Sequence, residues 1–243
     1  MGRTPNRVEV LGLPVDVLDR RGLLDAVAGH IDAGDRVTLG YLNVHVVNTA
    51  MRDEGLADFL RGLDLCYADG AGVVLGAELL GHKLPERMTG ADWIWDLAEA
   101  AAGRWRIVWI GGEPGVSGAA AEVLRARFPS LELHPEHGFE SDVASLIERV
   151  NGFEPDIVLV GMGTPTQERW TQIHRSALSA PVVWCLGATA DFVSGKTSRG
   201  PAWLHHNQEW LARLWTEPGR LWKRYLVGNP LFLVRVLRER ARR

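Results

Sequence analysis

The chain has 243 residues, 46% of them hydrophobic and 23% charged, which is the composition of an ordinary soluble globular protein. Residues 219–243 hold eight basic residues and one acid, although the whole chain carries a net charge of −3, so the body before them is acidic. An acidic body argues against nucleic acid wrapping the protein, and a basic tail indicates an anionic partner for that segment.

Strand-like apolar runs alternate with amphipathic helical segments along most of the chain. Because each run is almost entirely apolar, we expect a mainly parallel sheet with helices on both faces, a Rossmann-like, doubly wound α/β fold. The length suits one such domain with an appendage. We expect strands at about 8–17 (a strand or hairpin), 36–42, 63–67, 106–110, 131–134, 156–160 and 181–186, and helices at about 21–33, from 49, 53–63, 73–80, 92–102, from 115 to 127, 141–150 and 167–177.

Two cysteines, Cys66 and Cys185, lie inside apolar runs, which is typical of buried thiols in a reducing compartment. We expect no secretory leader, and no apolar stretch is long enough to span a bilayer. The sequence has no metal-binding Cys/His spacing and no Asp-x-Asp pair. We therefore expect no metal ion and no cofactor.

The stretch 67–92 places a lone acid, Asp69, between a predicted strand and a predicted helix. Two interpretations of Asp69 are open: it caps the helix that follows, or it acts as a general base at the carboxyl end of the sheet, where α/β folds bind ligands. Asn43, Arg87 and Gln167 also follow predicted strand ends. A parallel sheet would gather these side chains along one edge. His45, His205 and His206 are weaker candidates for a base.

Three glycine-bearing loops follow the strands that end near residues 110, 160 and 186. Backbone N–H groups at such junctions suit a phosphate or diphosphate, although glycines also simply turn a chain. Neither the GxGxxG fingerprint nor a Walker lysine is present, which argues against NAD and P-loop chemistry. From these loops we take as candidates for binding a phosphorylated ligand or its diphosphate Gly111, Gly112, Gly163, Thr164, Gln167 and Asp191.

The chain changes character near Arg199 and becomes rich in Trp, Leu and Arg, so we divide it into a catalytic domain, 1–198, and an appendage, 199–243. Aromatic and basic residues together favour the headgroup level of an anionic membrane. The alternative is that the tryptophans pack the appendage onto the body. The appendage offers Arg213, Arg220 and Arg224 as cations for a diphosphate.

Five stretches resemble the WecG/TagA/CpsF glycosyltransferases in order and spacing. The resemblance covers about residues 8–237, and it is carried by ADGAGVVLGAELLG, LPERMTGAD, GMGTPTQE, LGATADFVSGKTSRGP and EWLARLWTEPGRLWKRYLVGNPLFLVRVL.

The resemblance implies an inverting, metal-independent enzyme associated with the inner face of the cell membrane. It would move an N-acetylmannosamine-type sugar from UDP to a polyprenyl-diphosphate-linked sugar in surface-polysaccharide or teichoic-acid synthesis. By the same resemblance Asp69 is the general base, Asn43, Arg87 and Gln167 are site residues, and the three appendage arginines reach the donor diphosphate.

This chain departs from the family where members often have Thr two residues before the matching Asn; here that residue is Tyr41. Asn207 and Gln208 likewise replace the usual Gly-Leu before Glu-Trp. Two other functions stay open, a noncatalytic module that binds UDP-sugar or anionic lipid and a Rossmann-type oxidoreductase. An oligomer is also possible.

Overall fold

The computed structural model describes residues 6–196, 219 and 222–243. An N-terminal antiparallel hairpin precedes a six-stranded sheet in which every pairing is parallel. The expected fold class is thereby confirmed. The strands are β1 (Arg7–Val10), β2 (Leu13–Asp16), β3 (Val37–Leu42), β4 (Leu65–Ala68), β5 (Arg106–Gly111), β6 (Glu132–Glu136), β7 (Ile157–Gly161) and β8 (Val182–Cys185).

The sheet has the order β4-β3-β8-β7-β5-β6, so β3 and β8 are central although they are far apart in sequence. This order brings the carboxyl ends of β3, β4, β7 and β8 to one region of a single edge. The helices in the described part of the chain are α1 (Arg20–Ala33), α2 (Val44–Ala50), α3 (Glu54–Arg61), α4 (Ala71–Leu79), α5 (Gly90–Ala101), α6 (Val116–Arg127), α7 (Val143–Gly152), α8 (Thr166–His174), α9 (Thr189–Val193) and α12 (Gly228–Arg240), with a 3-10 turn η1 (Arg175–Ala177) and a π-helical segment η3 (Lys223–Val227).

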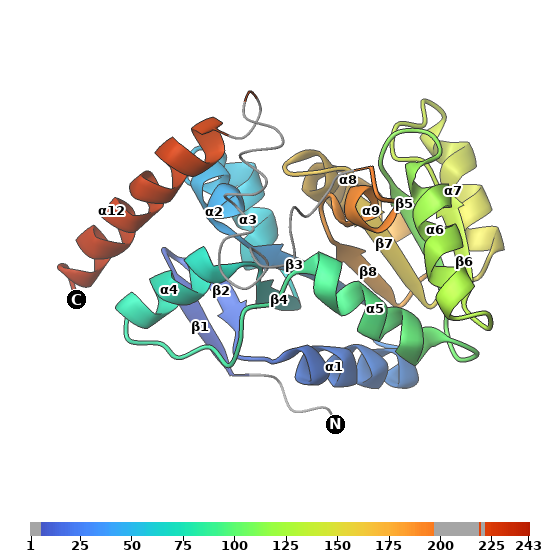
Figure 1. The fold of residues 1–243 in the computed structure, drawn as a ribbon, viewed down its shortest axis with the longest axis horizontal. Coiled ribbons are helices and arrows are strands. Elements are labelled where there is room, and N and C mark those ends of the chain that lie inside the picture. The colour runs from blue at the N-terminus through green and yellow to red at the C-terminus, as the bar shows by residue number, and fades with distance from the viewer. Residues whose placement is uncertain (1–5, 197–218, 220–221) are drawn as a thin grey trace.

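Helices cover both faces of the sheet. In β5, Ile107 and Trp109 join the core formed with α1, α5 and α6, whereas Val108 and Ile110 join a second core with α7. Successive strand residues point to opposite faces, so an apolar strand needs a cover on each side. Figure 1 shows the α6–α7 end of the molecule opposite the end where α12 lies beside α2.

The hairpin is attached to β4, the strand that ends just before Asp69. Asp16, at the end of β2, is buried and pairs with Arg7 at 2.7 Å. Its Oδ2 also accepts the Cys66 N–H in β4 at 2.7 Å. Burying this carboxylate is tolerable because an arginine and a backbone donor satisfy its oxygens.

The C-terminal helix packs on the α/β body. Phe232 and Val236 on its inner side are buried, and they lie over Gly76 in α4. Asn48 in α2 donates to the Gly228 carbonyl at 2.8 Å and accepts from Arg235 at 2.5 Å. The boundary expected near residue 199 lies outside the described residues.

One predicted helix start is wrong. The helix expected from about residue 49 begins at Val44, directly after β3. The β-branched run of Val44, Val46 and Val47 favours a strand, but Asn43 caps the helix by accepting the Val46 N–H at 3.0 Å.

Candidate active site

A cavity of about 570 Å³ lies at the carboxyl edge of the sheet. Its wall comes from the ends of β3, β4, β7 and β8, from the segment before α5, and from the C-terminal segment. Ligands of open α/β sheets bind at this edge. Of the predicted site residues, the cavity is lined by Asn43, Asp69, Arg87, Gly163, Thr164 and Arg224.

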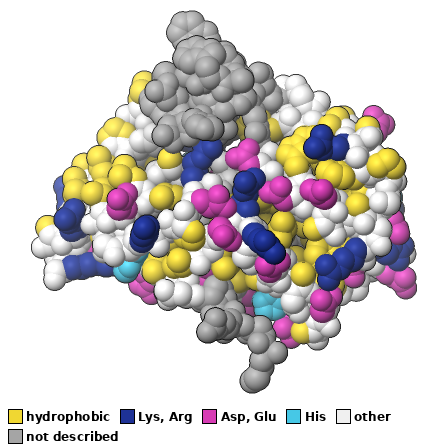
Figure 2. Space-filling view, turned by 60° about the horizontal axis from the view of Figure 1, so that its bottom comes forward, with side chains coloured by type: hydrophobic (Ala, Val, Ile, Leu, Met, Phe, Trp, Pro, Cys, Tyr) yellow, Lys and Arg dark blue, Asp and Glu magenta, His cyan; other side chains and the backbone are white. Residues whose placement is uncertain are grey.

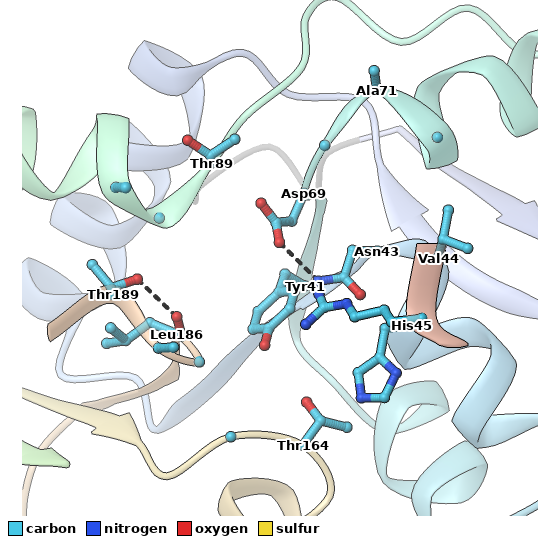
Figure 3. Close-up of a pocket in the computed structure, with 18 of the residues that line it drawn as sticks. Tyr41, Asn43, Val44, His45, Asp69, Ala71, Thr89, Thr164, Leu186 and Thr189 are labelled. Carbon is cyan, nitrogen blue, oxygen red and sulfur yellow. Dashed lines mark hydrogen bonds between the residues drawn. The ribbon is translucent and has the colours of Figure 1, made fainter. Parts of the chain in front are cut away.

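Asn43 and Asp69 form a pair across two neighbouring strand ends. The Asn43 amide donates to Asp69 Oδ2 at 2.9 Å, while its carbonyl oxygen caps α2 (Figure 3). The side-chain amide is therefore held by the helix on one side and orients the carboxylate on the other. A carboxylate held in this way can accept a proton from a ligand hydroxyl.

Asp69 does not cap the helix that follows it. The N-cap residue of α4 is Gly70, with φ 91°, and no side chain of the described residues caps this helix end. A positive φ of this kind suits glycine. Gly70, Ala71 and Gly72 line the cavity, so the uncapped first turn of α4 faces it. The capping interpretation of Asp69 is wrong.

Arg87 lies on the same side of the cavity as Asp69. The loop that carries Arg87 is fixed to β4 because the Gly70 N–H donates to the Met88 carbonyl and the Met88 N–H to the Ala68 carbonyl. Arg87 Nη2 is 4.0 Å from Asp92 Oδ2, and Asp92 also accepts from the Thr89 hydroxyl at 2.7 Å. A cation is thereby held at the cavity wall.

The C-terminal segment contributes Arg224, Tyr225 and Asn229 to the cavity. Sequence analysis missed Tyr225 and Asn229, although both lie in the YLVGNPLFL stretch that carries the family resemblance. Arg213, Arg220, His205 and His206 lie outside the described residues.

His45 lies in the first turn of α2 and lines the cavity. Burial, with the Arg224 charge as a second cause, lowers the pKa of His45 to about 4. Its imidazole is therefore neutral near pH 7. Burial also raises the pKa of the neighbouring Tyr41 hydroxyl, which stays protonated.

Gln167, which we expected to contact the donor, is held in the interior of the protein. Gln167 is fully buried in the first turn of α8 and does not line the cavity. Its Oε1 accepts the Gly187 N–H at 2.9 Å, and its Nε2 donates to Glu168 at 2.7 Å. Gln167 therefore supports the cavity wall from the interior of the protein.

Gly111 and Gly112 also lie away from the cavity wall. A Cβ on Gly111 would come within 2.6 Å of the Gly161 carbonyl, and one on Gly161 within 2.8 Å of the Gly187 carbonyl. These glycines therefore permit close approach of the ends of β5, β7 and β8. Asp191, in α9, lies 3.8 Å from Lys196 and likewise does not line the cavity.

In the described ranges, no group of three or more His, Cys, Asp or Glu side chains is placed to hold a metal ion. Among the helices that the structure describes, none combines the length and apolar character needed to cross a bilayer.

A parallel α/β sheet with an acid and two arginines around an edge cavity is typical of enzymes that act on phosphorylated ligands. Sequence comparisons define the class further. The model of the Glycosyl transferase WecG/TagA/CpsF family matches residues 8–243, so the chain belongs to this family of glycosyltransferases.

The relatives found by sequence search include enzymes named N-acetylglucosaminyldiphosphoundecaprenol N-acetyl-beta-D-mannosaminyltransferase. Those of Staphylococcus aureus strains MRSA252 and NCTC 8325 are each 25% identical to this chain over 205 residues, covering 82% of this chain and 79% of the relative.

Proposed function

We propose that this protein is an inverting, metal-independent glycosyltransferase. It moves an N-acetylmannosamine-type sugar from a UDP-sugar to a polyprenyl-diphosphate-linked saccharide, in surface-polysaccharide or teichoic-acid synthesis. The observation that carries the proposal is that the Asn43–Asp69 pair lines one cavity together with Arg87 and Arg224. The names of the staphylococcal relatives, which specify this sugar and a lipid-diphosphate acceptor, support the substrate class.

Asp69 is the general base of this reaction. It takes the proton from an acceptor hydroxyl as that oxygen attacks the anomeric carbon of the donor sugar. The bond between the anomeric carbon and the UDP oxygen breaks on the opposite face, and UDP leaves with the electron pair. One displacement inverts the anomeric configuration, and Asp69 later releases its proton to water.

Arg87, Arg224 and the first turn of α4 stabilise the diphosphate charge. The first turn of α4 presents backbone N–H groups that no side chain of the described part of the chain caps, and the helix dipole adds a partial positive charge there. Two guanidinium groups add fixed cations without a metal ion. The cavity, at about 570 Å³, is in the range of sites that hold one small ligand.

The C-terminal segment also brings the protein to the membrane surface, where a polyprenyl acceptor resides. We define its lipid-facing surface as the exposed side chains Trp222, Leu226, Val227, Leu233, Val234 and Leu237.

Basic residues flank this surface, including Lys223 and Arg238. An apolar stripe with basic neighbours adheres to anionic lipid. Figure 2 keeps the left–right order of Figure 1, and it shows hydrophobic side chains with basic ones among them at the end where α4 and α12 lie. The protein would thus act from the cytoplasmic side, peripherally bound.

UDP release is the direct test. A set of UDP-sugars is offered with a short-chain lipid-diphosphate N-acetylglucosamine acceptor, in buffer containing EDTA. We expect acceptor-dependent UDP release with the N-acetylmannosamine donor. Binding of UDP-sugar without release would favour a noncatalytic binding module, and a strict requirement for Mg²⁺ would contradict the metal-independent mechanism.

A further inference from the structure

Two buried residues, Gln167 and Glu168, lie directly behind the cavity wall. Both are in the first turn of α8, with exposed fractions of 0% and 3%. Neither lines the cavity. Each contacts residues that do line it, and these contacts come from three different strand ends.

Glu168 Oε1 accepts two hydrogen bonds, from the Thr164 hydroxyl at 2.8 Å and from Gln167 Nε2 at 2.7 Å. Gln167 Oε1 accepts the Gly187 N–H at 2.9 Å, and Gln167 Nε2 lies 3.5 Å from the Tyr41 hydroxyl oxygen. The Gln167 amide can be oriented in only one way here, because a backbone N–H must meet its oxygen and a carboxyl oxygen must meet its nitrogen.

These contacts decide whether polar groups on this part of the cavity wall can donate or accept a hydrogen bond. Thr164 has one hydroxyl hydrogen, and Gly187 has one backbone N–H; both are committed to the interior. The Thr164 oxygen can therefore meet a ligand only as an acceptor. Burial raises the pKa of Glu168, but Oε1 accepts whether the carboxyl is charged or neutral.

Other parts of the lining have the reverse character, with Arg87, Arg224 and the first turn of α4. The diphosphate of a UDP-sugar is fully ionised near pH 7, so its oxygens only accept hydrogen bonds and match these cations and N–H groups. Hydroxyl and amide groups of a sugar or a uracil can donate, so they match the Thr164 side.

We propose that Glu168 is a positioning residue that makes the Thr164 side of the cavity an acceptor surface for an N–H or O–H group of the donor substrate, and not for its diphosphate. This inference rests on the proposed function and deepens it, because it divides the cavity into a subsite for the sugar or base and a subsite for phosphate. Figure 3 shows Thr164 on the far side of Tyr41 from Asp69.

Two matched pairs of variants test it. Glu168→Gln keeps an acceptor oxygen toward Thr164, whereas Glu168→Met removes it; Thr164→Ser keeps a hydroxyl, whereas Thr164→Val removes it. We expect Glu168→Met and Thr164→Val each to raise the donor KM about tenfold, the effect of roughly one hydrogen bond, with a smaller change in kcat. Glu168→Gln should restore most of the affinity.

The double variant Thr164→Val/Glu168→Met should lose no more affinity than Thr164→Val alone, because Glu168 acts through Thr164. Additive losses would overturn the proposal. If Glu168→Met fails to fold, as thermal unfolding will show, the Thr164 pair and Glu168→Gln still decide the matter.

Calorimetry measures the affinity of the full chain for UDP-N-acetylhexosamine, UDP and inorganic pyrophosphate. Comparing the three affinities shows which part of the donor substrate contacts Thr164. If Thr164→Val weakens the binding of UDP-sugar but not of UDP, Thr164 contacts the sugar. If it weakens the binding of UDP as well, Thr164 contacts the nucleoside. Weaker binding of pyrophosphate, or no change with any ligand, overturns the inference. If wild-type protein binds UDP-sugar but shows no UDP release, only the transferase proposal fails; if it binds none of the three, both fail.

Discussion

The side-chain amide of Asn43 joins two strand ends, donating to Asp69 Oδ2 at 2.9 Å and accepting the Val46 N–H at 3.0 Å. One residue thereby begins α2 and orients the candidate base. This double role allows the effect on stability to be separated from the effect on activity. In Asn43→Ala both contacts are lost, whereas in Asn43→Ser the hydroxyl can still cap the helix but is too short to reach Asp69.

We expect Asn43→Ala to lower the free energy of unfolding by about 1 kcal/mol, and Asn43→Ser to lower it by much less. Turnover should fall similarly in both, because Asp69 loses its donor in each. Urea unfolding and UDP-release rates check this prediction. If turnover falls in Asn43→Ala but not in Asn43→Ser, as the free energy of unfolding does, then Asn43 only caps α2 and does not orient Asp69.

Asp69→Asn should reduce kcat by about 10²–10⁴-fold, since an amide cannot take the acceptor proton. The thermal midpoint should change little, because Asp69 caps no helix. Asp58→Asn is the matched control: Asp58 lies on the surface of α3, paired with Arg61 at 2.8 Å. Near-normal turnover by Asp69→Asn would remove this residue from the mechanism.

His45 reports on the position of Arg224. Burial and the Arg224 charge hold the pKa of His45 at about 4, so Arg224→Gln should raise it, which an NMR titration of the imidazole will measure. Arg238→Gln, on the exposed side of α12, should leave the titration unchanged. An unaltered His45 in Arg224→Gln would contradict the observed approach of the C-terminal segment.

The same shift has a consequence for stability. The unfolded chain binds a proton at His45 near pH 6.5, whereas the folded chain binds it only near pH 4. Stability is therefore lost as the pH falls from about 6.5 to 4. Because the ring is partly exposed, we expect this loss to be about 1–2 kcal/mol, and His45→Gln should remove it from urea unfolding curves.

Gly76 allows α12 to pack on α4. A Cβ at Gly76 would come within 2.6 Å of Phe232 Cζ, so Gly76→Ala should weaken this packing by about 1–3 kcal/mol despite the better helix propensity of alanine. Amide exchange in α12 should speed up and turnover should fall, while Gly76→Ala/Phe232→Leu recovers both. Gly29→Ala, in α1 with nothing within 4 Å, is the control and should not lose activity.

The lipid-facing surface can be removed without touching the cavity. Trp222→Ser/Leu226→Ser/Leu237→Ser should abolish sedimentation with anionic liposomes, since each large apolar side chain contributes about 1.5–3 kcal/mol when buried. Turnover of a short-chain, water-soluble acceptor should persist. Val123→Ser/Phe139→Ser/Ile173→Ser removes exposed apolar area elsewhere. Equal loss of binding in this control would mean that the adhesion is nonspecific.

The sequence predicted the fold well because each buried strand is bounded by polar or glycine-bearing segments. The same pattern brought Asn43, Asp69, Arg87 and Thr164 to one edge, since parallel strands end together. It could not predict the start of α2, because the β-branched residues after Asn43 obscure a helix whose start depends on one cap.

Glycines after strand ends were the least reliable predictors of ligand contacts. Gly111 and Gly161 are required by the approach of neighbouring backbones, which local sequence does not distinguish from contact with a phosphate. For Gln167 the difficulty is different. A polar residue just after a strand end is often predicted to contact a ligand, but the Gln167 side chain is buried and accepts a hydrogen bond from the Gly187 N–H.

The position of Arg224 in the chain has a consequence for synthesis. The ribosome makes all eight strands that the structure describes before it makes Arg224 and α12, so on the growing chain Asp69 is present before the last wall of the cavity. A nascent or prematurely terminated chain would therefore have the acid but lack this guanidinium. Under the proposed mechanism, such a product would bind the nucleotide without completing the transfer.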